Sequence, residues 1–207
     1  MRYWGVRSSV VACLIAVVFM CGACNGGATN GPRSTQPPGL AGLSTRLVLF
    51  NPQGQQVPLE SLRGHPTLVA FIDTSCTQFC WETTRKLREV ASNLGPQQGQ
   101  DVRFVLITYN PLYDGPKRLA KYADTMQLDS SHWTLLTGAP ENIDWALRRF
   151  GMPGTSKVDN PMLLMNQLDY VFLVGPDGRI ANKYVGPQME VSKVAEDTRT
   201  MLARKNS

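Results

Sequence analysis

The apolar residues of the chain switch repeatedly between the spacing of strands and the spacing of helices. Residues 46–50 alternate apolar and polar side chains, and residues 51–54, Asn-Pro-Gln-Gly, have the composition of a turn. Residues 55–59 can therefore return as the second strand of a hairpin. Residues 67–72 form a run rich in apolar side chains, which is typical of a central strand covered on both faces.

A helical period follows this run and continues to a glycine–proline break. Counted from Cys80, the next apolar or small positions lie four, seven, eleven and fourteen residues on, which places Cys80 on the core-facing side of a helix. These positions are Thr84, Leu87, Ala91 and Leu94. Gly95 and Pro96 are expected to end this helix.

Two further strand–helix units are predicted next. Residues 102–108 form a second buried strand, and Asp114 can cap the helix that follows it. The apolar stripe of that helix consists of Leu119, Tyr122, Ala123 and Met126. Residues 133–136 form a short strand. Another helix begins at Pro140, the first helical position that proline favours, and stops at Gly151.

The last part of the chain predicts a loop, a hairpin and one more helix. The loop covers residues 154–161, and the hairpin joins residues 170–174 to residues 179–185 through a Gly-Pro-Asp-Gly turn. The final helix runs from about residue 188 to residue 203. The order is a starting hairpin, β-α-β-α, an inserted βα unit and a closing ββα. This order predicts an α/β sandwich of thioredoxin type.

The first 24 residues have the pattern of an export signal. Arg2 and Arg7 precede an apolar run over residues 10–20, which is shorter than the ~20 residues that cross a bilayer. Small residues then precede Cys24, as in a bacterial lipobox, although Cys21 stands where an aliphatic residue is usual. We expect Cys24 to be lipidated and to become the mature amino terminus, with an uncleaved anchor or plain secretion as alternatives.

A polar segment separates this leader from the folded domain. Residues 25–43 are rich in Gly, Pro, Ser, Thr, Gln and Asn, which predicts a flexible tether, and residues 44–207 form the domain. Removing Arg2 and Arg7 from the 21 basic residues leaves 19 against 16 acidic ones. This small, scattered excess does not indicate a nucleic-acid partner. The predicted location is therefore outside the cytoplasm, tethered to a bacterial membrane.

Two of the five cysteines lie in the domain, at the junction of a predicted strand and helix. A thiol at a helix amino terminus faces unpaired N–H groups that favour the thiolate. On a regular helix the Cα atoms of Cys76 and Cys80 lie about 6 Å apart, within the range of a disulfide. Two thiolates also suit Cu(I). The pair can therefore form a reversible disulfide, hold a soft metal, or be two inert core cysteines.

Three segments of the chain resemble the SCO/SenC family of copper chaperones. Residues 73–80, Asp-Thr-Ser-Cys-Thr-Gln-Phe-Cys, look like its CxxxC segment. Residues 133–138 are similar to its inserted unit, and residues 172–178 resemble its closing hairpin. The matches extend over roughly residues 47–203. The resemblance implies a thioredoxin-like fold, export, copper binding by both cysteines and a role in cytochrome c oxidase assembly.

The chain departs from this family at the third copper ligand. The family's histidine stands eight residues before the glycine of the Gly-Pro-Asp-Gly turn, and Gln167 occupies that position here. A neutral amide is a poor copper ligand, whereas the thioethers of Met162 and Met165 in the same loop are soft enough for Cu(I). The alternative for each methionine is that it only packs in the core or the loop and binds no copper. His65 and His132 are expected to be polar surface residues.

Smaller departures occur near the cysteines. Thr77 and Trp81 replace usual prolines, and Asn110 precedes Pro111 where an aspartate is usual.

The sequence leaves two main functions open. The first is a membrane-tethered chaperone that takes copper, with Cu(I) favoured, through Cys76 and Cys80 and passes it to the copper subunit of cytochrome c oxidase or another exported client. The second is a thiol-disulfide oxidoreductase in which the more exposed Cys76 attacks and Cys80 resolves. A partner-binding scaffold without either activity is a third interpretation. No distinct peroxidase motif is present.

Overall fold

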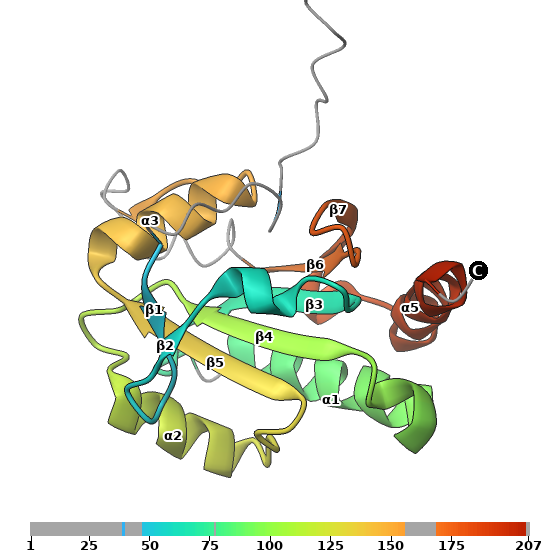
Figure 1. Ribbon diagram of the computed structural model, residues 1–207. Coiled ribbons are helices and arrows are strands. Elements are labelled where there is room, and N and C mark those ends of the chain that lie inside the picture. The colour runs from blue at the N-terminus through green and yellow to red at the C-terminus, as the bar shows by residue number, and fades with distance from the viewer. Residues whose placement is uncertain (1–38, 40–46, 77, 156–168, 206–207) are drawn as a thin grey trace, which may run out of the picture. The chain divides into compact units, whose positions relative to one another are not determined.

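A seven-stranded mixed sheet forms the centre of the domain in the computed structural model (Figure 1). The structure describes residues 39, 47–76, 78–155 and 169–205. Contacts divide the chain into residues 1–33 and residues 34–207, and every described residue belongs to the second unit. The strand order is β2-β1-β5-β4-β3-β6-β7.

Three parallel strands form the middle of the sheet, and most of their residues are buried. Strand β3 (Thr67–Ile72) pairs in parallel with β4 (Arg103–Thr108), which pairs in parallel with β5 (Trp133–Gly138). On its other side β3 pairs antiparallel with β6 (Tyr170–Val174), and β6 pairs antiparallel with β7 (Ile180–Val185). Every residue of β3 is buried, as the apolar run predicts for a strand covered on both faces.

The predicted amino-terminal hairpin is present but short. Strands β1 (Leu49–Phe50) and β2 (Gln56–Val57) are antiparallel, and β1 adds antiparallel to β5. The Asn51 carboxamide oxygen closes the turn by accepting the backbone N–H groups of Gln53 and Gln55, at 3.0 and 2.9 Å. This Asx-type bonding explains why the turn forms where the sequence predicts it.

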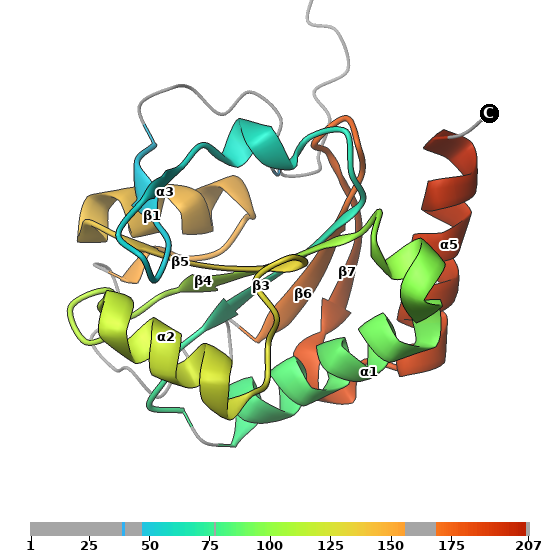
Figure 2. The same ribbon diagram turned by 60° about the horizontal axis from the view of Figure 1, so that its bottom comes forward.

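The helices cover both faces of the sheet. Helices α1 (Phe79–Gly99) and α2 (Pro116–Thr125) lie along one face, and α3 (Pro140–Arg149) lies on the other (Figures 1 and 2). Helix α5 (Val191–Lys205) packs against α1. Short 3-10 turns, η1 (Leu59–Leu62) and η3 (Gly186–Gln188), complete the domain. None of the described helices combines the length and apolar character needed to cross a membrane.

The predicted break at Gly95–Pro96 is confirmed, and two other expectations need correction. Gly95 has φ 74° and ψ 171°, so the first helical stretch ends there, although a further helical turn continues to Gly99. The amino-terminal cap of α2 is Gly115, and Asp114 makes no capping bond, because its carboxylate is buried among other partners. The last helix begins at Val191, because residues 186–188 form η3 instead.

The thioredoxin-type order predicted from the sequence is confirmed. Strand β3, α1, β4 and α2 are followed by the inserted β5 and α3, and β6, β7 and α5 close the fold. Because β3, β4 and β5 are parallel, their carboxyl ends meet at one edge of the sheet. The antiparallel register of β6 brings Asp169 level with Ile72 at this same edge. Residues 156–168, which include most of the predicted loop, lie outside the described part of the chain.

Replacing Gly186 by alanine is expected to destabilise the fold at this edge. A Cβ atom at position 186 would lie 2.4 Å from both the Asp169 carboxylate and the Thr83 hydroxyl. We expect the Gly186→Ala change to lower the free energy of unfolding by about 1–3 kcal/mol in urea denaturation. Gly99→Ala is the matched control, since its nearest neighbour would be 3.9 Å away. Equal stability of the two variants would contradict this packing.

Candidate functional site

Cys76 and Cys80 lie together in the turn between β3 and α1. The backbone N–H of Cys76 donates to the carbonyl oxygen of Asp73 at 3.0 Å, and the backbone N–H of Cys80 donates to the Cys76 sulfur at 3.3 Å. Both cysteines are free thiols and both are buried, with exposures of 5% and 4%. The sequence predicts that Cys76 is the more exposed of the two, but the exposures are nearly equal and do not distinguish the two sulfurs.

The two sulfurs differ in the direction in which their pKa values are shifted. The Cys80 side chain donates a hydrogen bond to Cys76, and the backbone N–H groups of residues 78–80 add to it, so the pKa of Cys76 falls to about 6 although burial opposes this. The same hydrogen bond, together with burial and the neighbouring negative charge, raises the pKa of Cys80 far above its ordinary value. These shifts favour a thiolate at Cys76 and a neutral thiol at Cys80.

Two tyrosines pack behind Cys80, and no sequence pattern predicts that either of them contacts it. The Tyr109 hydroxyl lies 3.8 Å from the Cys80 sulfur, and the Tyr122 hydroxyl donates to the Cys80 carbonyl oxygen at 3.4 Å. Tyr122 also contacts the Thr84 hydroxyl at 2.7 Å. Burial raises the pKa of both tyrosines, so both hydroxyls stay protonated. Tyr122 was predicted only as part of an apolar stripe.

The carboxylate of Asp73 shapes the first half of the cysteine turn. One oxygen accepts the backbone N–H of Ser75 at 2.8 Å and its hydroxyl at 2.6 Å. The other oxygen accepts the side-chain N–H of Asn110 at 3.0 Å. Asn110 therefore contributes a neutral donor to the site, where a second carboxylate would repel Asp73.

The buried carboxylate of Asp114 joins the turn after β3 to the loop after β4. It accepts the backbone N–H of Thr74 at 3.0 Å and the hydroxyl of Thr108 at 2.6 Å, and the Thr74 hydroxyl donates to its other oxygen. Burial raises the pKa of Asp114 even though these donors favour its charged form. The residue predicted as a helix cap therefore holds the cysteine turn in place.

A second contact ties the start of β6 to α1, one turn beyond Cys80. The Thr83 hydroxyl donates to the Asp169 carboxylate at 2.7 Å, and the backbone N–H of Gly186 donates to the Asp169 carbonyl oxygen at 2.8 Å. Burial raises the pKa of Asp169. The candidate residues Met162, Met165 and Gln167, like Cys24, lie outside the described residues. Thr77 is also outside them.

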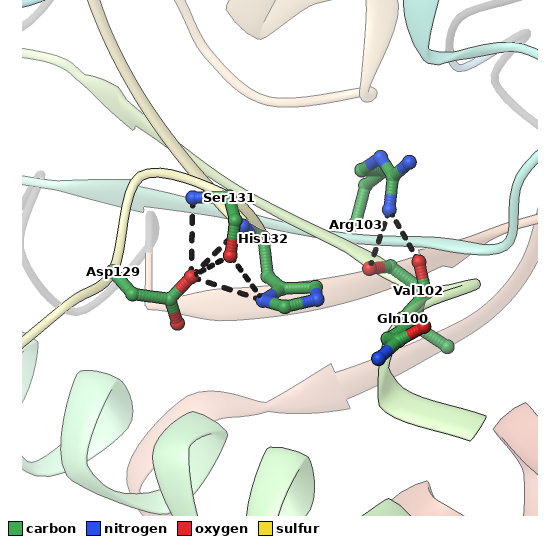
Figure 3. Close-up of polar contacts among 6 residues, drawn as sticks. All are labelled: Gln100, Val102, Arg103, Asp129, Ser131 and His132. Atoms are coloured by element: carbon green, nitrogen blue, oxygen red, sulfur yellow. Dashed lines mark hydrogen bonds and ion pairs between the residues drawn. The ribbon is translucent and has the colours of Figure 1, made fainter. Parts of the chain in front are cut away.

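Neither histidine is brought to the cysteines. His65 precedes the amino end of β3, where its Nδ1 lies 3.2 Å from the Asp101 carbonyl oxygen. His132 precedes β5, and its Nδ1 contacts both the Ser131 hydroxyl at 2.7 Å and the Asp129 carboxylate at 2.9 Å (Figure 3). A serine–histidine–aspartate relay needs the two partners on opposite ring nitrogens, so this cluster is a loop cap at the far edge of the sheet.

The metal-binding atoms that the described residues offer at this site are the two cysteine sulfurs. Within residues 47–76, 78–155 and 169–205, no three His, Cys, Asp or Glu side chains are grouped closely enough to hold a metal ion. Zinc in a structural site takes four ligands, whereas Cu(I) is satisfied by few, soft ligands. The two sulfurs therefore fit Cu(I) better than a metal that needs carboxylate or imidazole.

A thioredoxin-type sheet with a thiolate–thiol pair at its first strand-to-helix turn defines the chain as an α/β dithiol protein. The SCO1/SenC family profile matches residues 36–203. The chain belongs to the SCO1/SenC family.

Known relatives agree with this assignment. The chain is 32% identical to the SCO1 protein homolog of Bacillus subtilis (strain 168) over 138 residues, which covers 66% of this chain and 70% of that protein. It is similar to the structure of BsSco, a member of the Sco family of cytochrome c oxidase assembly proteins, with 29% identity and a TM-score of 0.62, covering 74% of this chain and 90% of that one. Copper-bound yeast Sco1 shares the fold, with 17% identity and a TM-score of 0.63 over 84% and 95% of the two chains.

The lowered pKa of Cys76 predicts the pH dependence of its alkylation. Since only the thiolate reacts, the rate with iodoacetamide should rise through a midpoint at about pH 6 and level off above it. The measurement is mass spectrometry of the reduced domain across pH. Cys80→Ala removes the side-chain donor and should move the midpoint up, whereas Cys80→Ser keeps a hydroxyl donor. A wild-type midpoint at the ordinary thiol value of ~8.5 would contradict the geometry.

Removing the Asp114 carboxylate should loosen the cysteine turn. Asp114→Ala leaves the buried Thr74 N–H and the Thr108 hydroxyl without their acceptor, so we expect the free energy of unfolding to fall by about 3 kcal/mol. Asp124→Ala, on the exposed side of α2, is the control and should change it by less than about 0.5 kcal/mol. Equal chemical stability of the two variants would argue against the role of Asp114.

Proposed function

We propose that this protein is a copper chaperone that acts in the assembly of the cytochrome c oxidase copper site. The observation that carries the proposal is the buried thiolate–thiol pair of Cys76 and Cys80 in a SCO1/SenC domain. Copper is the cargo. The client is the copper subunit of the oxidase or another exported copper or thiol protein.

The protonation of the pair supports stepwise capture of Cu(I). The Cys76 thiolate binds the ion first, because it is already charged at neutral pH. The positive ion then lowers the proton affinity of Cys80, which releases its proton and becomes the second thiolate ligand. Delivery is a ligand exchange in which sulfur or nitrogen ligands of the client replace the two cysteines one at a time. No electron is transferred in this sequence.

Sulfur ligands favour Cu(I) over Cu(II) here. Gln167 supplies a neutral amide at the position of the family's histidine, and the thioethers of Met162 and Met165 are further soft donors in the same segment. We propose Cys76 and Cys80 as the ligands, with either methionine as an additional one. Cu(II), which prefers imidazole nitrogen, is then held weakly.

A second function, thiol-disulfide exchange, is favoured by the same pKa difference. The Cys76 thiolate attacks a partner disulfide, one partner sulfur leaves as a thiolate, and a mixed disulfide forms. Cys80 then loses its proton and attacks the Cys76 sulfur. This step forms the Cys76–Cys80 disulfide and releases the partner fully reduced. Tyr109, whose hydroxyl lies 3.8 Å from the Cys80 sulfur, can stabilise the Cys80 thiolate during the attack.

The amino-terminal segment supports a tethered location. We propose that residues 1–24 are an export signal, that Cys24 carries a lipid anchor, and that residues 25–43 space the domain from the membrane. The domain would then work in the compartment where oxidase copper sites are assembled and where thiols can be oxidised.

Copper titration tests the chaperone function. The reduced domain should take up one equivalent of Cu(I) in competition with a chromophoric chelator, because both sulfurs are needed for a stable site. Cys76→Ser and Cys80→Ser should each lower the affinity by at least about a hundredfold, in line with the loss of a metal ligand. Cu(II) should be held far more weakly than Cu(I).

Wild-type protein that takes up no stoichiometric Cu(I) would exclude the chaperone function. Rapid turnover of a partner disulfide by that same metal-free protein would instead favour the oxidoreductase.

A further inference from the structure

The large apolar side chains that are exposed gather at the edge of the sheet that carries the cysteines. In the described part of the chain they are Phe79, Leu112, Tyr113 and Val185, with exposures of 39%, 89%, 42% and 44%. Phe79 stands directly before Cys80, and Val185 ends β7 opposite Tyr170. Scattered exposed apolar residues are normal, but four that share one edge indicate a binding surface.

Two of these side chains belong to a turn that is fixed to the cysteine loop. The backbone N–H groups of Tyr113 and Asp114 donate to the carbonyl oxygen of Asn110, at 3.1 and 2.8 Å. The Asn110 and Asp114 side chains are themselves bonded to the loop after β3, at Asp73 and Thr74. The turn therefore presents Leu112 and Tyr113 to solvent in a held conformation, so little conformational freedom is lost when they bind.

Positive charge borders this apolar surface. Lys117 and Arg118 are exposed in the first turn of α2, which contains no acidic residue, and the Arg118 guanidinium lies 3.7 Å from the centre of the Tyr113 ring. Cations at a helix amino terminus are unfavourable for the helix, because its dipole is positive there. Carboxylates from another molecule would be attracted by both the two cations and the helix end.

We propose that Leu112, Tyr113, Lys117 and Arg118 form a docking face for the client protein, which offers an apolar patch bordered by acidic side chains. The inference rests on the proposed function, since it names the surface that brings the acceptor to the dithiol. The turn that carries Leu112 and Tyr113 is bonded to the cysteine loop at Asp73 and Thr74, so a molecule seated on the face lies beside that loop. An anionic membrane would suit the same charges but would offer no copper ligand or disulfide, so we favour a protein.

The probe for this face is the purified soluble copper-site domain of the oxidase subunit from the same organism. Its affinity for the reduced wild-type domain, with and without Cu(I), is measured by calorimetry at low and high salt. The double variant Leu112→Ser/Tyr113→Ser should weaken binding at least about tenfold, as for a central aromatic contact. Lys117→Glu/Arg118→Glu should weaken it at low salt, with a smaller effect at high salt.

Arg179→Glu is the control, because Arg179 is an exposed cation in the turn at the opposite edge of the sheet. It should leave the affinity unchanged. Both double variants should take up Cu(I) like wild type, since none of the altered residues takes part in the hydrogen bonds to the two sulfurs.

The outcomes separate this proposal from the proposed function. Unchanged affinity in both double variants, or no binding by wild type in either form, would overturn the docking face while Cu(I) uptake still supports the chaperone. If the double variants lose binding to phosphatidylglycerol vesicles but keep their affinity for the client, the face binds a membrane and the proposal is overturned. Weakened client binding in a protein that takes up no Cu(I) would support the face and exclude the copper function.

Discussion

The geometry of the site depends on the hydrogen bonds that the Asp114 carboxylate accepts. This carboxylate is buried, and it accepts hydrogen bonds from Thr74 on one loop and Thr108 at the end of β4. Parallel strands bring their carboxyl ends together but leave the loops beyond them free to take many conformations. A single acceptor shared between two loops removes that freedom. The cysteine turn and the exposed turn at Leu112 are consequently fixed relative to each other.

The chemistry of the dithiol follows from this fixed turn. With the turn held, N–H groups at the start of α1 are bonded to the Cys76 sulfur, among them the backbone N–H of Cys80 at 3.3 Å. One sulfur is then charged and the other neutral, which prepares the pair for a cation or for a disulfide. Buried tyrosines behind Cys80 exclude water without adding charge. The same arrangement suits both proposed functions, copper capture and thiol exchange, so the ligands offered by the client would decide between them.

Most of the fold was predictable, because it depends on local patterns. The apolar run of β3, the stripe that includes Cys80 and the Asn51 turn all act within a few residues. The site was predictable only in its two cysteines. Asp114 was mistaken for a helix cap, because a carboxylate before a helix has the same sequence pattern whether it caps or is buried. Tyr109 gave no pattern at all, since its partner Cys80 lies 29 residues away.

The central claim is that Cys76 and Cys80 bind Cu(I) through sulfur, without an imidazole ligand. X-ray absorption at the copper K edge of the Cu(I)-loaded wild-type domain tests it most directly. The account predicts a first shell of sulfur scatterers and no outer-shell scattering from an imidazole ring. A first shell of nitrogen or oxygen, or clear imidazole scattering, would contradict it, because His65 and His132 would then have to reach a site from which the fold separates them.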